Sequence, residues 1–217
     1  GRNNDGQLGD NSTTNRDEPV QIGTATNWQS ISARNIHSMG IRSNGTLWAW
    51  GDGFDGKLGL NSFDDKLTPT QVGTASNWAN VSCGEWHNIA VRTNGTLWTW
   101  GNNSYSQLGQ GMNSVNSWIP NQVGTQANWR TAVSGDRGCM AVKTDDSIWG
   151  WGSNQGDLGN ATDDSSNVPL YIECYSTLLE NEDFTLSDSM KVYPNPVKGG
   201  QLNFQISDLK QIGRAHV

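Results

Sequence analysis

Apolar and polar positions alternate in short runs along most of the chain, and glycine and asparagine separate these runs. Residues 37–42 (HSMGIR) and 46–51 (TLWAWG) flank an Asn-Gly pair, which supplies the positive φ that a tight turn requires. The pattern therefore predicts a β-hairpin over residues 37–51. The stretch 28–32 (WQSIS) also alternates and predicts a further strand.

This pattern is repeated along the chain. The Trp-x-Trp-Gly motif ends at Gly51, Gly101 and Gly152, at spacings of 50 and 51 residues. The other landmarks recur in the same order, with Leu-Gly at 8–9, 58–59, 108–109 and 158–159, proline at 19, 69, 120 and 169, and Asn-Trp at 27–28, 77–78 and 128–129. A fixed period of this length is the sequence signature of a repeat architecture.

The repeated unit predicts an all-β fold. Both faces of the strand TLWTW carry apolar groups, as expected for a strand between two neighbouring sheets. Glycine-punctuated β units of this length are typical of propeller blades, and a parallel β-helix, the alternative, has shorter turns. We expect a partial β-propeller over residues 1–172, with units at 1–50, 51–100 and 101–151 and part of a fourth at 152–172.

Residues 83–109 (CGEWHNIAVRTNGTLWTWGNNSYSQLG) resemble the regulator of chromosome condensation repeat, with its Gly-x-x-His strand, Asn-Gly turn, Trp-Gly and Gln-Leu-Gly. The resemblance extends over about residues 1–172. It implies a seven-bladed propeller and, through the family name, guanine nucleotide exchange on a small GTPase.

Two positions depart from the repeat. The repeat histidine (His37, His87) is Gly138 in the third unit, and the repeat glycine (Gly84, Gly135) is Arg34 in the first. Three and a third units are too few for seven blades, so we expect a piece of a longer propeller. Its preceding blades are expected to close the ring by pairing with residues 152–172.

The C-terminal part follows a different pattern. Residues 173–189 are acidic and are interpreted as a linker, and 190–207 are typical of two strands that begin a small β-sandwich. Residues 190–210 also resemble the start of a type IX secretion C-terminal sorting domain, whose motif is Tyr193-Pro194-Asn195-Pro196. That resemblance implies the type IX machinery as a partner and a secreted or outer cell-surface location in a bacterium. Residues 212–217 (IGRAHV) match a translated sequencing adapter, so we expect segment 211–217 to be read-through.

Composition and charge exclude several classes of protein. The chain has 14 Lys+Arg against 21 Asp+Glu, a net charge of −7, which disfavours a nucleic-acid or anionic-membrane binder. No apolar run approaches the roughly 18–20 residues of a membrane span. The acidic loops do not complete a calcium-binding pattern, so we interpret their Asn and Asp residues as turn residues. No metal or cofactor is predicted.

The sequence contains no motif-framed catalytic group. His37 and His87 occupy equivalent repeat positions, and we expect hydrogen-bonded structural roles for both. Cys83 and Cys139 are expected to be small buried side chains. An exported glycan-active enzyme stays open as an alternative, because loop carboxylates such as those of Asp64 and Asp163 could form an acid pair.

Aromatic residues that break the repeat are the candidate contact residues. They lie in variable loops, at Phe54, Phe63, Trp86, Tyr105 and Trp118. Aromatic side chains dominate binding hot spots, although the alternative, that some only cover blade edges, is equally open. We therefore predict a non-enzymatic binding or adhesion module whose partner is a protein or a glycan.

Overall fold

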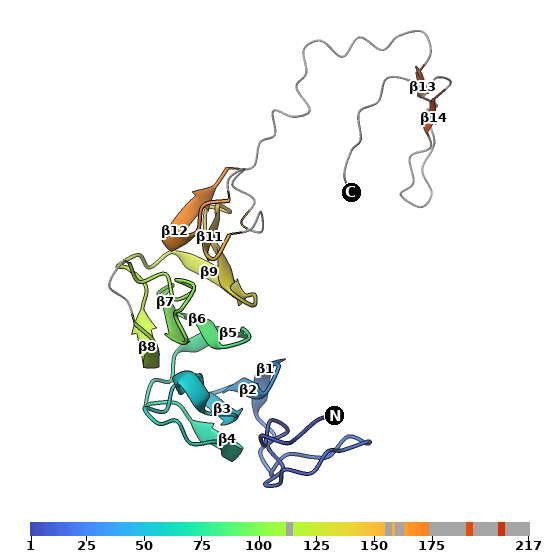
Figure 1. Cartoon of the computed structure of the whole chain (residues 1–217), viewed down its shortest axis with the longest axis vertical. Coiled ribbons are helices and arrows are strands. Elements are labelled where there is room, and N and C mark those ends of the chain that lie inside the picture. Colours follow the sequence, from blue (N-terminus) through green and yellow to red (C-terminus); the bar gives the residue numbers. More distant parts are fainter. Residues whose placement is uncertain (112–114, 155–157, 159–162, 174–189, 193–203, 207–217) are drawn as a thin grey trace. The chain divides into compact units, whose positions relative to one another are not determined.

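The computed structural model describes residues 1–111, 115–154, 158, 163–173, 190–192 and 204–206. The chain divides into two compact units, Gly1–Glu173 and Cys174–Val217. Three four-stranded antiparallel sheets follow one another through the first unit (Figure 1). The fold is all-β, as predicted.

The strands of each sheet follow one another in sequence order. The first sheet consists of β1 (Trp28–Arg34), β2 (His37–Arg42), β3 (Leu47–Gly51) and β4 (Lys66–Gln71). The second consists of β5 (Trp78–Cys83), β6 (His87–Arg92), β7 (Leu97–Gly101) and β8 (Ser117–Gln122). The third consists of β9 (Trp129–Ser134), β10 (Gly138–Lys143), β11 (Ile148–Gly152) and β12 (Ser166–Ile172). A 3-10 turn, η1 (Phe54–Gly56), lies in the β3–β4 loop.

The predicted hairpin turns are confirmed in all three sheets. Gly45 and Gly95 have φ of +76° and +77°, the conformation that the Asn-Gly pair provides without steric cost. In the third sheet Asp146 adopts the same left-handed conformation with φ of +66°. Aspartate tolerates this region better than most residues, so the turn survives the loss of glycine.

The sheets are out of phase with the sequence units. Each sheet takes its outer strand from the unit that follows, because that strand pairs with the Trp-x-Trp-Gly strand after the long loop. The expected pairing of residues 152–172 with preceding blades stays a prediction. β12 pairs with β11 and completes the third sheet, with Trp149 opposite Tyr171.

The repeated motifs join each sheet to the next. The Trp100 indole Nε1 donates to the Lys57 carbonyl oxygen at 3.0 Å, and Trp151 Nε1 donates to that of Gln107 at 3.0 Å. Gly59 lies against the Trp100 ring, where a Cβ would stand 2.9 Å from the indole nitrogen. The Leu-Gly motif thus lets the loop of one sheet dock on the buried tryptophan of the next.

The first and third sheets each expose a face that is covered in the middle sheet. Ile31 is 61% exposed, whereas Val81 at the same strand position is 8% exposed. Met140 is 37% exposed, whereas the equivalent Met39 and Ile89 are fully buried. This difference in exposure between the middle sheet and the two outer sheets is expected of a partial propeller, in which each blade covers one face of its neighbour.

The second unit contains β13 (Met190–Val192) paired antiparallel with β14 (Phe204–Ile206), which lie within the two predicted strands. The sorting motif Tyr193-Pro194-Asn195-Pro196, linker residues 174–189 and segment 211–217 lie outside the described residues. Within the described part of the chain, no helix is long and apolar enough to cross a membrane.

Candidate binding face

The long loops and the β1–β2-type turns lie at the same end of every sheet. In the first sheet His37 is opposite Gly51, and Gly51 is opposite Lys66, so the β1–β2 turn and the β3–β4 loop share one end. The same ends of neighbouring sheets lie next to each other, as the 2.8 Å contact between His37 Nε2 and Asn88 Oδ1 shows. We call this end the loop face, defined by residues 34–37, 52–66, 84–87, 102–111, 115–118 and 135–138.

All five predicted contact residues lie on the loop face. Four of them are widely exposed, and they are Phe54 (61%), Phe63 (51%), Trp118 (46%) and Tyr105 (42%). Trp86 is half-buried in the turn between β5 and β6. The structure thus places on one surface the aromatic residues that the sequence scatters over 65 positions.

Phe63 and Trp118 form the most developed aromatic contact of this face. Their ring centroids are 4.9 Å apart and the ring planes are inclined at 67°. The indole rests on the backbone of the β3–β4 loop, where a Cβ on Gly56 would lie 2.6 Å from Trp118 Cδ1. The Asn61 amide also donates to the Trp118 carbonyl at 2.9 Å. The pair therefore joins two sheets, yet each ring keeps about half of its surface open.

A groove of about 540 Å³ lies beside this pair, and we call it the aromatic groove. Its lining comprises Asp55, Phe63, Asn103, Ser104, Val115, Asn116 and Trp118. Both carboxylate oxygens of Asp55 are held by amides, Oδ2 by Asn102 Nδ2 at 2.9 Å and Oδ1 by Asn116 Nδ2 at 3.4 Å. The groove thus combines exposed aromatic surface with a fixed carboxylate.

Phe54 and Trp86 surround a buried lysine. The Lys57 ammonium nitrogen lies 4.8 Å from the Trp86 ring centroid and 6.0 Å from that of Phe54, and it forms an ion pair with Asp52. Its side chain is fully buried. A cation over aromatic rings is an attractive arrangement, so part of the role of Trp86 is to cover this charge.

The histidines and cysteines make hydrogen bonds from one sheet to the next. His87 Nε2 lies 3.2 Å from Cys139 Sγ, and Cys83 Sγ donates to the Ser32 carbonyl at 3.2 Å. Burial lowers the pKa of His37 to about 4 and that of His87 to about 3, so both imidazoles are neutral. Burial also raises the pKa of Cys83 to about 12 and raises that of Cys139. Both histidines are hydrogen-bonded and both cysteines are buried, as predicted.

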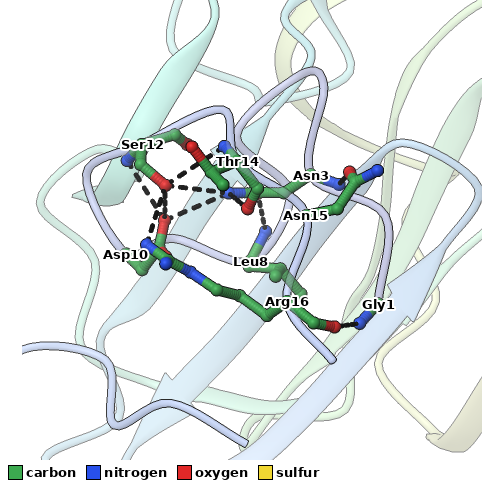
Figure 2. Close-up of polar contacts among 8 residues, drawn as sticks. All are labelled: Gly1, Asn3, Leu8, Asp10, Ser12, Thr14, Asn15 and Arg16. Atoms are coloured by element: carbon green, nitrogen blue, oxygen red, sulfur yellow. Dashed lines mark hydrogen bonds and ion pairs between the residues drawn. The ribbon is translucent and has the colours of Figure 1, made fainter. Parts of the chain in front are cut away.

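The Asn-rich N-terminal loop is organised by hydrogen bonds to its own chain (Figure 2). Asn3 Nδ2 donates to Asp10 Oδ1 at 3.1 Å and to the Ser12 carbonyl at 2.9 Å, and Asn3 Oδ1 accepts from the Leu8 amide at 2.8 Å. Asn103 repeats the last contact with Leu108 at 2.9 Å. These contacts support the interpretation of the loop as a turn structure. In the described part of the chain, no group of three or more His, Cys, Asp or Glu residues could hold a metal ion.

Sequence reasoning missed several residues of this face. Arg34, which replaces the repeat glycine in the first unit, forms an exposed ion pair with Asp136 of the third sheet. A second pocket of about 530 Å³ includes both residues, but Val133 and Met140 on the open face of the third sheet also line it. We therefore assign this pocket to blade packing and not to a ligand.

The repeats are those of a known family. The profile described as Regulator of chromosome condensation (RCC1) repeat matches residues 1–41, 44–91 and 94–142, and a second profile of the same description matches 78–107. The chain belongs to the RCC1 repeat family. The match covers the loop face of all three sheets up to residue 142. No sequence among the curated proteins matches the chain significantly.

Solved structures share this fold, and two of them are of yeast Prp20. Human WBSCR16 is 22% identical, with a TM-score of 0.71, over 88% of this chain and 50% of that one. Yeast RCC1 (Prp20) bound to Kap60 is 16% identical, with a TM-score of 0.61, over 70% of this chain and 38% of that one. Prp20p from Saccharomyces cerevisiae, in a structure described with its binding to Gsp1p and histones, is 17% identical, with a TM-score of 0.63, over 70% of this chain and 39% of that one. The chain thus spans half or less of the length of these proteins.

Proposed function

We propose that this RCC1-repeat chain is a non-enzymatic binding module that recognises a protein or glycan through its loop face. The observation that carries the proposal is the gathering of Phe54, Phe63, Trp86, Tyr105 and Trp118 on one face of the partial propeller, four of them at least 42% exposed. Exposed aromatic side chains on loops held by a rigid scaffold are the usual means of recognition.

The chemistry of the described titratable groups supports binding rather than catalysis. The two described histidines are buried and neutral, and each bonds a side chain of the next sheet. Asp64 and Asp163, the acid pair of the enzyme alternative, belong to loops of the first and third sheets.

We further propose that the chain is exported and attached to, or released from, a bacterial cell surface by the type IX machinery. The support is the sequence motif Tyr193-Pro194-Asn195-Pro196 together with the pairing of β13 and β14 on either side of it. Export can be tested by expressing the chain in a bacterium that has this machinery and locating it by cell fractionation. Retention of the chain in the periplasm would contradict this part of the proposal.

Guanine nucleotide exchange has less support. Prp20p is described with binding to Gsp1p and histones, but at 17% identity the likeness supports the fold alone. A direct assay of nucleotide release from Gsp1p in the presence of this chain tests the alternative, and acceleration of release would favour it over the proposal.

The main proposal is tested by measuring binding of the full chain to protein and glycan arrays. The variant combining Phe54→Ala, Tyr105→Ala and Trp118→Ala should lose binding, because it removes three exposed rings of the loop face. Tyr171→Ala is the matched control, since Tyr171 is a 54% exposed aromatic at the opposite end of the third sheet. Loss of binding in the control but not in the triple variant would place the binding surface elsewhere.

A further inference from the structure

We propose that the aromatic groove binds a neutral pyranose unit of a glycan. This inference rests on the proposed binding function and names the ligand class for one part of the loop face. The lining of the groove includes the aromatic rings of Phe63 and Trp118 and polar side chains such as those of Asp55 and Ser104.

The aromatic part of the groove suits the apolar face of a sugar ring. A pyranose carries C–H groups on its ring faces, and these pack on the electron-rich face of an aromatic ring. Phe63 and Trp118 are 51% and 46% exposed, so surface remains for such stacking after their mutual contact. Joining the two sheets accounts for the 4.9 Å contact between the rings but not for their open surface.

The polar part of the groove suits the hydroxyl groups of the same sugar. Each carboxylate oxygen of Asp55 accepts one amide hydrogen, from Asn102 or Asn116, and an ionised carboxylate has about four acceptor sites in all. Its remaining lone pairs can accept hydrogen bonds from sugar hydroxyls. The Ser104 hydroxyl adds a group that both donates and accepts.

The groove is held in shape before a ligand arrives. Asn116 Oδ1 accepts from the Asn103 amide at 2.8 Å, and the Gly56 backbone supports the Trp118 indole. Asp55 is fixed in a left-handed conformation with φ of +60° while its side chain spans to the second sheet. A rigid site loses less conformational entropy on binding, which matters for a weakly binding ligand such as a sugar.

Size and charge favour a neutral glycan over other ligands. A volume of about 540 Å³ lies within the range of small-molecule sites. The Asp55 carboxylate and the net charge of −7 disfavour uronic or sialic acids, because like charges repel. An aromatic surface flanked by hydrogen-bonding groups leaves a neutral sugar as the best match.

The test is titration calorimetry of the full chain with neutral oligosaccharides of glucose, mannose, galactose and N-acetylglucosamine, beside oligogalacturonate as an acidic probe. At least one neutral series should bind, with Kd between about 10 μM and 1 mM. Trp118→Ala should weaken binding at least tenfold, and Trp118→Phe, which keeps a ring, should retain most of it. Tyr171→Ala is the matched control, since Tyr171 is an exposed aromatic residue at the opposite end of the third sheet and should leave Kd unchanged.

The possible outcomes separate this inference from the proposed function. Thermal unfolding should first show that Trp118→Ala is folded. If a neutral sugar binds and this variant leaves Kd unchanged, the groove assignment is wrong. If only oligogalacturonate binds, or no sugar binds while a protein on the array binds in a manner dependent on Trp118, the ligand class is wrong and the loop face stands. If neither sugars nor proteins bind, both proposals are wrong.

Discussion

The junction between the first and second sheets and the junction between the second and third have the same geometry but different polar partners. His37 bonds the Asn88 amide at the first junction, whereas His87 bonds the Cys139 thiol at the second. The loop carbonyl that receives the next tryptophan belongs to Lys57 at the first junction and to Gln107 at the second. The scaffold thus depends on backbone acceptors and buried tryptophans, and the side-chain partners can change.

The residues around these two carbonyls show how such a change is compensated. At the second junction Gln107 Nε2 donates to Asn102 Oδ1 at 3.1 Å. At the first junction both positions are charged, and Lys57 pairs with Asp52. A neutral amide pair has therefore been exchanged for a buried ion pair on the same backbone.

The largest expected effect is that of acid on both junctions, through the two buried histidines. The unfolded chain protonates its histidines near pH 6.5, while the folded chain keeps His37 and His87 neutral down to about pH 4 and about pH 3. The contribution of the two histidines to the free energy of unfolding should therefore be at its maximum above pH 6.5. It should fall by about 1.4 kcal/mol per pH unit for each imidazole as the pH drops toward 4. Urea unfolding at several pH values measures this slope.

The variant His37→Gln tests the assignment, because its amide can still donate to Asn88 but cannot titrate. Its slope between pH 6.5 and 4 should be about half that of the wild type. An unchanged slope would show that the acid sensitivity comes from groups other than the junction histidines.

The buried ion pair should give the next largest effect, confined to the first junction. Asp52→Asn leaves the buried Lys57 ammonium without a counter-charge and should cost about 3–5 kcal/mol in the free energy of unfolding. The double variant Asp52→Asn, Lys57→Gln reproduces the Asn102–Gln107 pair of the second junction and should recover to within about 1 kcal/mol of the wild type. Additive losses in this double-mutant cycle would show that the two junctions are not interchangeable.

The comparison of the junctions also shows what the sequence can and cannot predict. The strands, the hairpin turns and the structural roles of His37 and His87 were predictable, since alternation, Asn-Gly pairs and repeat position are local signals. The pairing of β12 with β11 was not, because the sequence unit does not reveal on which side of the long loop a sheet closes. The ion pair between Asp52 and Lys57 could have been predicted from the sequence. The equivalent positions in the third unit are both amides, Asn102 and Gln107, so the two charges appear together.

The aromatic groove and the ion pair between Arg34 and Asp136 could be identified only from the structure. Asp55 meets Asn116 across 61 positions, and Arg34 meets Asp136 across 102 positions. The repeat pattern marks Phe63 and Trp118 as unusual but does not tell which of the variable loops lie together. The position of a residue within the repeat predicts the face of the sheet on which it lies. Its contact partners depend on how neighbouring sheets pack and are known only from the structure.

Two equivalent glycines distinguish a covered junction from an open face. A Cβ on Gly84 would lie 2.5 Å from His87 Cε1 and 2.8 Å from the Gly135 carbonyl oxygen, whereas a Cβ on Gly135 would have its nearest neighbour at 3.5 Å. Gly84→Ala should therefore cost about 1–3 kcal/mol, as overpacking does, and Gly135→Ala should change the free energy of unfolding by less than about 0.5 kcal/mol. Chemical denaturation of both variants measures the difference, and equal losses would contradict the open face of the third sheet.

The smallest expected effect is that of the one described ion pair that links the first sheet directly to the third. The side chains of Arg34 and Asp136 are 44% and 60% exposed, so solvent screens their attraction. Arg34→Gly, which restores the residue found at positions 84 and 135, should lower the free energy of unfolding by at most about 1 kcal/mol at low salt. In 0.5 M salt the variant and the wild type should have the same free energy of unfolding, because ions at this concentration screen exposed charges over a few ångströms. A loss well above 1 kcal/mol that persists in high salt would mean that Arg34 packs the inner strands as well as pairing with Asp136, and that the two junctions are coupled through it.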